Sequence, residues 1–89
     1  MMIPIYMAKV VGNVVATKKE ESLVGFKLMI VQRIDSQKHP IGCEEVAADY
    51  VGAGIGEYVL VCTGSAVRVN KQGVSLDLAI LGIIDQMDV

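Results

Sequence analysis

The sequence predicts an all-β domain, a small five-stranded β-barrel of the OB-like type with one or two short helical turns. Three observations predict it. Five short segments are rich in Val, Ile and Leu, the first of them alternates with a period of two, and polar or glycine-containing stretches separate them. A chain of 89 residues without a linker or low-complexity tract is expected to form one domain over residues 1–89.

The first predicted strand covers about residues 6–17. Its odd positions include Lys9, Asn13 and Thr17, whereas its even positions carry small or apolar residues. The even positions are therefore predicted to face the interior, and they are Ala8, Val10, Gly12, Val14 and Ala16. Small interior side chains are typical of a narrow, strongly curved barrel.

The second predicted strand covers residues 27–34 and the third about residues 45–51. In the second strand, Leu28, Ile30 and Ile34 are predicted to share one apolar face, opposite the charged Lys27, Arg33 and Asp35. The segment between these strands, residues 36–42, contains a proline, a glycine and the only histidine of the chain. It is therefore predicted to be a loop.

The last two predicted strands, residues 58–62 and 78–85, are apolar on both faces. Between them, Thr63, Gly64 and Ser65 are predicted to turn the chain, with a short helical turn that ends near Arg68. One face of each strand can line the barrel, but a domain of this size offers no partner for the other face. The outward faces of these strands are thus a candidate subunit interface.

Composition favours self-association over a membrane. Hydrophobic residues make up 53% of the chain, yet a chain of this length buries only about 60 to 70% of its surface when it folds alone. A membrane-spanning helix needs about 20 apolar residues in succession, and the best run, LAILGII, lies between Asp77 and Asp85. The N-terminal segment lacks the basic region of a signal peptide. We expect a cytoplasmic protein in which Cys43 and Cys62 are buried free thiols.

An OB-like barrel also raises the alternative of a binding module for single-stranded nucleic acid. Such a module uses a basic groove with aromatic side chains on which bases stack. Here the net charge is −2 and aromatic residues make up 4% of the chain. This alternative is therefore weak, and salt-sensitive binding of oligonucleotides would be the observation in its favour.

Residues 51–57, VGAGIGE, raise the question of a phosphate site. The glycines are spaced G-x-G-x-G, no Lys-Ser/Thr pair follows them, and the next residues form a predicted strand where phosphate motifs place a helix. Phosphate binding is therefore disfavoured. Gly52, Gly54 and Gly56 either form a tight turn or bulge, or allow close packing against another copy of the chain.

No pattern typical of catalysis or metal binding emerges. His39 and Cys43 are four residues apart, but Pro40 and Gly42 prevent a regular helix from aligning them. The TGSAV stretch is not a G-x-S-x-G nucleophile elbow. Aspartates at predicted strand ends more often cap turns than form a catalytic pair, and they are Asp49, Asp77 and Asp85. We expect no catalytic residue, no metal site and no cofactor.

Three stretches of the chain resemble the EutN/CcmL family, the vertex proteins of bacterial microcompartments such as carboxysomes and catabolic metabolosomes. They are AKVVGNVVATKK at residues 8–19, VGAGIGEYVLVCTGSAVR at residues 51–68 and LDLAILGIID at residues 76–85. With the KLMIVQRID segment they cover most of the chain in the order found in the family. The middle stretch is the most specific.

The resemblance implies an OB-related barrel that assembles as a cyclic homopentamer at the corners of a polyhedral shell, in contact with hexameric shell proteins. Six-sided tiles alone form a flat or rolled sheet, so a closed shell requires five-sided units. A structural protein without enzymatic activity, nucleic acid or membrane partner is expected. The resemblance also implies a set of residues near the subunit interface or the central axis, namely Gly52, Ala53, Gly54, Gly56, Glu57, Gly64, Ser65, Arg68, Asp77 and Asp85.

Overall fold

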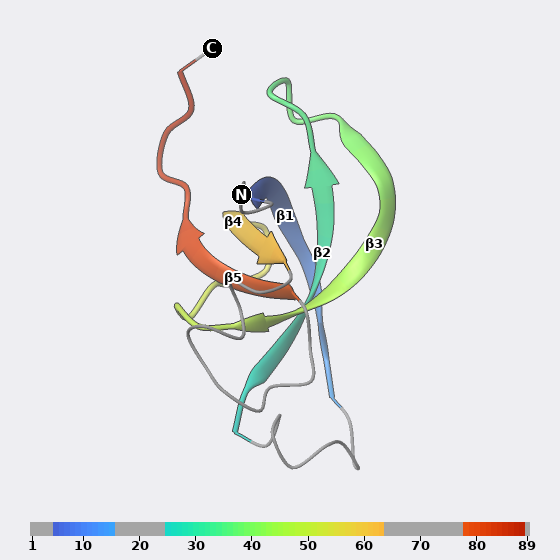
Figure 1. The fold of residues 1–89 in the computed structure, drawn as a ribbon, viewed down its shortest axis with the longest axis vertical. Coiled ribbons are helices and arrows are strands. Elements are labelled where there is room, and N and C mark those ends of the chain that lie inside the picture. The colour runs from blue at the N-terminus through green and yellow to red at the C-terminus, as the bar shows by residue number, and fades with distance from the viewer. Residues whose placement is uncertain (1–4, 16–24, 64–77, 89) are drawn as a thin grey trace.

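The computed structural model describes residues 5–15, 25–63 and 78–88, and every regular element in this part of the chain is a strand (Figure 1). The strands are β1 (Ile5–Val14), β2 (Lys27–Ile34), β3 (Pro40–Asp49), β4 (Tyr58–Thr63) and β5 (Leu78–Ile83). The prediction of an all-β chain with five strands is confirmed. The helical turn predicted near Arg68 lies outside the described residues.

The five strands close into a barrel in the order β1-β2-β3-β5-β4. Every neighbouring pair is antiparallel except β3 and β5, which run parallel over only two residue pairs, Ala48 with Ala79 and Asp49 with Ile80. The first half of β3 curves away from β5, on the opposite side of the molecule from β4 and β5 (Figure 1). A five-stranded barrel of this kind is the architecture that the sequence predicted.

Small aliphatic side chains fill the interior. The core cluster consists of Ala8, Val10, Met29, Val31, Ala47, Ala53, Val59, Val61 and Ile80. Ala8 and Val10 confirm the predicted inner face of β1. The strand then changes register between Val10 and Gly12, and Gly12 pairs with the half-exposed Ile30, so the predicted inward position of Gly12 is wrong. It ends at Val14, before the predicted end at residue 17, and residues 16 and 17 lie outside the described part.

The apolar face predicted for β2 is not the face that lines the central core cluster. Met29 and Val31 belong to the core cluster, whereas Leu28, Ile30 and Ile34 do not. Leu28 and Ile34 are nevertheless buried, and only Ile30 is half-exposed. Both faces of β2 are apolar over its first half, so the alternation of residue types does not tell which face points inward.

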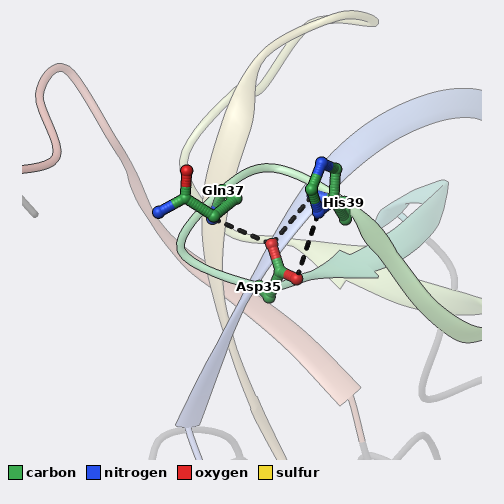
Figure 2. A network of polar contacts seen from close by, with 3 residues as sticks. All are labelled: Asp35, Gln37 and His39. Carbon is green, nitrogen blue, oxygen red and sulfur yellow. Dashed lines mark hydrogen bonds and ion pairs between the residues drawn. The ribbon is translucent and has the colours of Figure 1, made fainter.

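The connection between β2 and β3 is shorter than predicted, because β3 begins at Pro40, inside the segment expected to be a loop. The chain turns at Asp35. Its Oδ1 atom accepts hydrogen bonds from the backbone N–H groups of Gln37 and His39, at 2.8 and 2.9 Å (Figure 2). Lys38 adopts a positive φ of 67° in this turn. Pro40 fits the first position of a strand, where its missing N–H costs no ladder bond.

Candidate subunit interface: the glycine loop and an outer strand face

The glycine loop, residues 50–57, begins where Asp49 ends β3. The Asp49 Oδ1 atom accepts hydrogen bonds from the backbone N–H groups of Val51 and Gly52, at 3.0 and 2.9 Å. Asp49 is also the one buried charged residue in the described part of the chain. This geometry confirms the expectation that a strand-end aspartate caps a turn. Gly52 has a φ of +80°, which a residue with a side chain rarely adopts.

The second half of the loop closes on itself through Glu57. The Glu57 Oε1 atom accepts a hydrogen bond from the Gly54 N–H at 2.6 Å, and the Glu57 N–H donates to the Gly54 carbonyl at 3.2 Å. Gly56 completes this turn with a φ of +95°. Gly54 has no positive φ, so the backbone conformation of the loop requires glycine only at positions 52 and 56.

Two backbone hydrogen bonds join the loop to β1 at the position where that strand changes register. The Gly56 N–H donates to the Val10 carbonyl at 2.8 Å, and the Val10 N–H donates to the Glu57 carbonyl at 2.9 Å. Ala53 is fully buried in the barrel core, and its carbonyl accepts a hydrogen bond from the Lys27 Nζ atom at 3.3 Å. The loop therefore has a structural role within its own barrel, independent of any contact with another copy.

The structure brings the predicted residues Gly52, Ala53, Gly54, Gly56 and Glu57 into this one loop. Ile55, at its tip, is 64% exposed. The tip is available to another molecule, while contact with a second copy stays a prediction. The predicted residues that lie outside the described part are Gly64, Ser65, Arg68 and Asp77.

Asp85 lies exposed in the segment that follows β5 and makes no hydrogen bond or ion pair with the described residues. The structure thus gives it no role in the glycine loop. Sequence reasoning omitted Asp49 from the predicted site, although it organises the loop. The signal was present, since an aspartate at a strand end followed by glycine three residues later favours a side-chain-capped turn.

An outer apolar face lies on the neighbouring strands β1, β4 and β5. Leu60 of β4 is 41% exposed and Leu81 of β5 is 39% exposed. Met7 of β1 is paired with Leu60 across the sheet. The prediction that the outward side of β4 and β5 is left without a partner is confirmed for these two leucines. Cys62 and Ala79 of the same strands are buried.

The polar side chains at the barrel wall have structural roles. The Tyr6 hydroxyl donates a hydrogen bond to the Glu45 Oε1 atom at 2.8 Å, and the Arg33 guanidinium lies 4.7 Å from the centre of the Tyr6 ring. Burial, followed by the hydrogen bond and charge of Glu45, raises the pKa of Tyr6 far above its usual value. Tyr6 therefore stays a protonated donor that links β1 to β3.

The two cysteines are free. The prediction that they are buried is confirmed for Cys62 and wrong for Cys43, which is exposed on β3. Burial raises the pKa of the Cys62 thiol, which makes it a poor nucleophile. His39 does not approach Cys43 as a metal ligand would. Its Nδ1 atom lies 3.6 Å from the Asp35 Oδ2 atom (Figure 2). In the described residues, no three His, Cys, Asp or Glu side chains are grouped as a metal site.

Within the described part of the chain, no helix is long and apolar enough to cross a membrane.

Several named proteins, some of them with solved structures, are similar to this chain over nearly its whole length. The family model described as "Ethanolamine utilisation protein EutN/carboxysome" matches residues 5–85. The carboxysome shell vertex protein CcmL of Synechocystis sp. is 46% identical over 85 residues, which cover 93% of this chain and 85% of the relative. The microcompartment shell vertex protein GrpN of Rhodospirillum rubrum is 44% identical, over 93% of this chain and 96% of the relative.

Solved structures show the same barrel. The pentameric microcompartment shell protein GrpN from Rhodospirillum rubrum superposes with a TM-score of 0.87 at 43% identity, covering 94% of this chain and 98% of GrpN. CcmL from Gloeobacter violaceus gives a TM-score of 0.86 at 42% identity, covering 94% of this chain and 89% of that protein. Agreement of sequence and fold over this length identifies the chain as a member of the EutN/CcmL family.

Proposed function

We propose that this protein is a structural shell protein, a homopentamer that occupies the vertices of a polyhedral bacterial microcompartment. The observation that carries the proposal is the match to GrpN, whose structure is described as a pentameric microcompartment shell protein, with a TM-score of 0.87 over 94% of this chain. Named relatives from carboxysomes and from other microcompartments are likewise shell vertex proteins. The function is therefore structural and not enzymatic.

The apolar surface of the isolated protomer also favours self-association. Leu60 and Leu81 stand exposed on neighbouring strands. Burying apolar surface contributes about 25 cal/mol per Å², so an assembly that covers such a face is favoured. A cyclic ring covers it in every copy at once, because each protomer meets a neighbour on both sides.

The glycine loop is the second element that we assign to the assembly. Its backbone is held by Asp49 and Glu57, which leaves the exposed Ile55 and Val51 on a rigid support. Residues with little or no side chain at Gly52, Gly54 and Gly56 permit close approach of another backbone. We place this loop at the subunit boundary or at the central axis of the pentamer.

The partners beyond the pentamer are other shell proteins, which we expect to be hexameric facet proteins. A flat layer of six-sided units closes into a polyhedron only when five-sided units are added at its corners. The protein acts in the microcompartment shell, as a single domain over residues 1–89. Nothing in the named relatives supports the alternative of a module for single-stranded nucleic acid.

The decisive measurement is the subunit count of the purified protein by native mass spectrometry. A mass of five protomers supports the proposal, and a monomer at high concentration would contradict it. Fluorescence anisotropy with a labelled oligonucleotide at low salt tests the alternative in the same preparation. Strong binding that falls steeply with salt would favour the nucleic-acid module instead.

A second experiment tests the vertex role directly. Hexameric shell proteins are expressed with and without this protein, and the particles are imaged by electron microscopy. Closed polyhedra are expected only when this protein is present, whereas sheets, tubes or open particles are expected without it. Closed particles of equal number in both preparations would contradict a vertex role.

A further inference from the structure

A second outer face lies on β1, β2 and β3. Ile30 of β2 pairs with Gly12 of β1 on one side and with Val46 of β3 on the other. Ile30 and Val46 alternate with core residues of the same strands and so point away from the barrel interior. Gly12 lies on the same side as its partner Ile30, because the register of β1 shifts between Val10 and Gly12. Val46 is 36% exposed, and Ile30 is half-buried. We call Gly12, Ile30 and Val46 the second face, and Met7, Leu60 and Leu81 the first face.

The two faces share one local design, in which a large aliphatic side chain lies over a glycine of the next strand. On the first face, a Cβ atom built on Gly82 would lie 3.6 Å from the Leu60 Cδ1 atom. On the second face, a Cβ atom on Gly12 would lie 3.4 Å from the Ile30 Cδ1 atom. On the side of its glycine, the leucine or isoleucine of each face therefore has no side chain beside it. Such surfaces suit a closely packed protein interface.

The two faces are separate patches that point in different directions. In the barrel order, β1 stands between β4 and β2, and Figure 1 shows β4 and β5 on one side with β2 and the first half of β3 on the other. On β1 itself, Lys9 stands between Met7 and Gly12. The Lys9 and Lys38 Nζ atoms lie 5.9 and 4.9 Å from the centre of the Tyr58 ring. This charged strip marks a boundary between the faces.

A closed five-membered ring needs this arrangement. A patch that binds its own copy pairs subunits in twos, whereas a ring of five needs two different patches on every subunit, directed toward different neighbours. We infer that the first face of one protomer binds the second face of the next, as the central apolar contact of the pentamer. The inference rests on the proposed pentamer and adds to it which two surfaces meet.

The first test removes one face at a time. Leu60→Asp alters the first face and Val46→Asp the second, and each places a charge in the centre of an apolar contact. Ile41→Asp is the matched control, because Ile41 is an exposed aliphatic residue of β3 outside both faces. Native mass spectrometry is expected to show monomers for the first two variants and pentamers for the control and the unaltered protein.

Circular dichroism establishes that each variant remains folded, and Leu60→Thr is the second variant if Leu60→Asp does not fold. Threonine suits a strand but places a hydroxyl in the contact. A folded Val46→Asp protein that still forms pentamers as readily as the Ile41→Asp control would overturn the inference. So would a pentameric, folded variant at Leu60.

The second test reports which faces touch. In a Cys43→Ser background, which removes the exposed thiol, cysteines are introduced as Leu60→Cys, Val46→Cys or both, and the assembled protein is treated with a short bis-maleimide. The double variant is expected to give a covalent ladder that ends at five subunits. Each single variant is expected to give no crosslinked dimer. Dimers from either single variant, or no ladder from the double variant, would overturn the assignment.

The outcomes separate this inference from the proposed function. If the unaltered protein is pentameric but the crosslinks or variants behave otherwise, the pairing of the faces is wrong and the vertex proposal stands. If the unaltered protein is a monomer at high concentration, the proposed function itself fails.

Discussion

Two aspartates perform the same local task in different turns. Asp35 directly follows β2, and Asp49 ends β3. Each offers one carboxylate oxygen to two backbone N–H groups that the turn would otherwise leave unpaired. Such bonds satisfy donors that have no strand partner, so a single side chain sets the path of the chain at each site.

For Asp49, the substitution Asp49→Ala is expected to lower the free energy of unfolding by about 1–2 kcal/mol, because two N–H groups of the glycine loop lose their acceptor. Asp49→Asn is the matched variant, since it keeps the oxygen that accepts both bonds and is expected to cost less. Urea denaturation at one fixed protomer concentration measures both. Equal stability of the alanine variant and the unaltered protein would contradict this role.

For Asp35, the expectation concerns pH. The pKa of Asp35 is lowered from 3.8, its value in the absence of the fold. The largest cause is the hydrogen bond that the backbone N–H of His39 donates to the carboxylate. A carboxylate with a lowered folded pKa contributes stability above its unfolded pKa and loses it as the pH falls through the folded value. The turn is thus expected to stay intact down to about pH 4 and to loosen only in stronger acid.

Asp35→Asn tests this expectation, because the amide keeps an acceptor but does not titrate. NMR chemical shifts of the Gln37 and His39 amides, followed from neutral to acidic pH, are expected to move with the Asp35 titration in the unaltered protein. They are expected to lose that transition in the variant. An Asp35 transition at a pH above the pKa of this residue in the unfolded chain would show that the fold raises the pKa of Asp35 instead of lowering it.

At the scale of elements, the glycine loop is a rigid connection between β3 and β4. Asp49 and Glu57 hold its two ends, Ala53 enters the core, and two backbone bonds join it to Val10 of β1. Only a loop tied in this way offers the exposed Ile55 in a fixed place. A rigid surface loses little conformational entropy when it binds a partner.

Gly54 and Gly56 of the loop are expected to respond differently to alanine. Gly56→Ala places a side chain at a φ of +95°, which costs about 1–2 kcal/mol. Gly54→Ala has no such strain, and its Cβ atom would lie 3.4 Å from the carboxylate of Glu57, a flexible group that can shift. Thermal unfolding of the two variants compares them, and a larger loss of stability for Gly54→Ala would contradict the assignment.

Register shifts interrupt simple alternation in β1 and β2. The ladder between these strands shifts between Val10 and Gly12, and the ladder between β2 and β3 shifts between Gln32 and Ile34. A bulge adds a residue to one strand and turns the following side chains to the other face. Gly12, predicted to face the interior, consequently pairs with Ile30 on the outer side of the barrel.

For the whole molecule, the exposed faces make stability depend on assembly. Ten large hydrophobic residues in the described part are exposed in the protomer, so part of the apolar burial that stabilises the protein comes from its neighbours. Unfolding that is coupled to dissociation becomes harder as the protein concentration rises, by mass action.

The melting temperature of the unaltered protein is therefore expected to rise by about 4 °C or more for a tenfold increase in concentration. The Leu60→Asp variant is expected to melt at a lower temperature that does not change with concentration. Differential scanning fluorimetry over a dilution series measures both. A concentration-independent melting temperature for the unaltered protein would contradict coupling between folding and assembly.

The sequence by itself determined the number of strands, the approximate place of each, and the presence of apolar surface beyond what one barrel can bury. These properties are local or compositional, because β-branched residues, turn residues and hydrophobic content can be counted along the chain. The resemblance of three stretches also led to the correct family. Because β4 and β5 are apolar on both sides, their sequences indicated an outward apolar face, but not which residues form it.

Only the tertiary structure decided which face of β2 lines the barrel, where β3 begins, and what the glycines of residues 52–56 do. Met29 and Leu28 are equally apolar, and only closure of the barrel selects Met29 for the core. The Gly56 backbone N–H donates a hydrogen bond to the carbonyl of Val10, a residue far away in the chain. No pattern of side chains along the sequence predicts this bond. Contacts between distant segments depend on the packed arrangement of all five strands, and a local pattern of residue types does not contain that information.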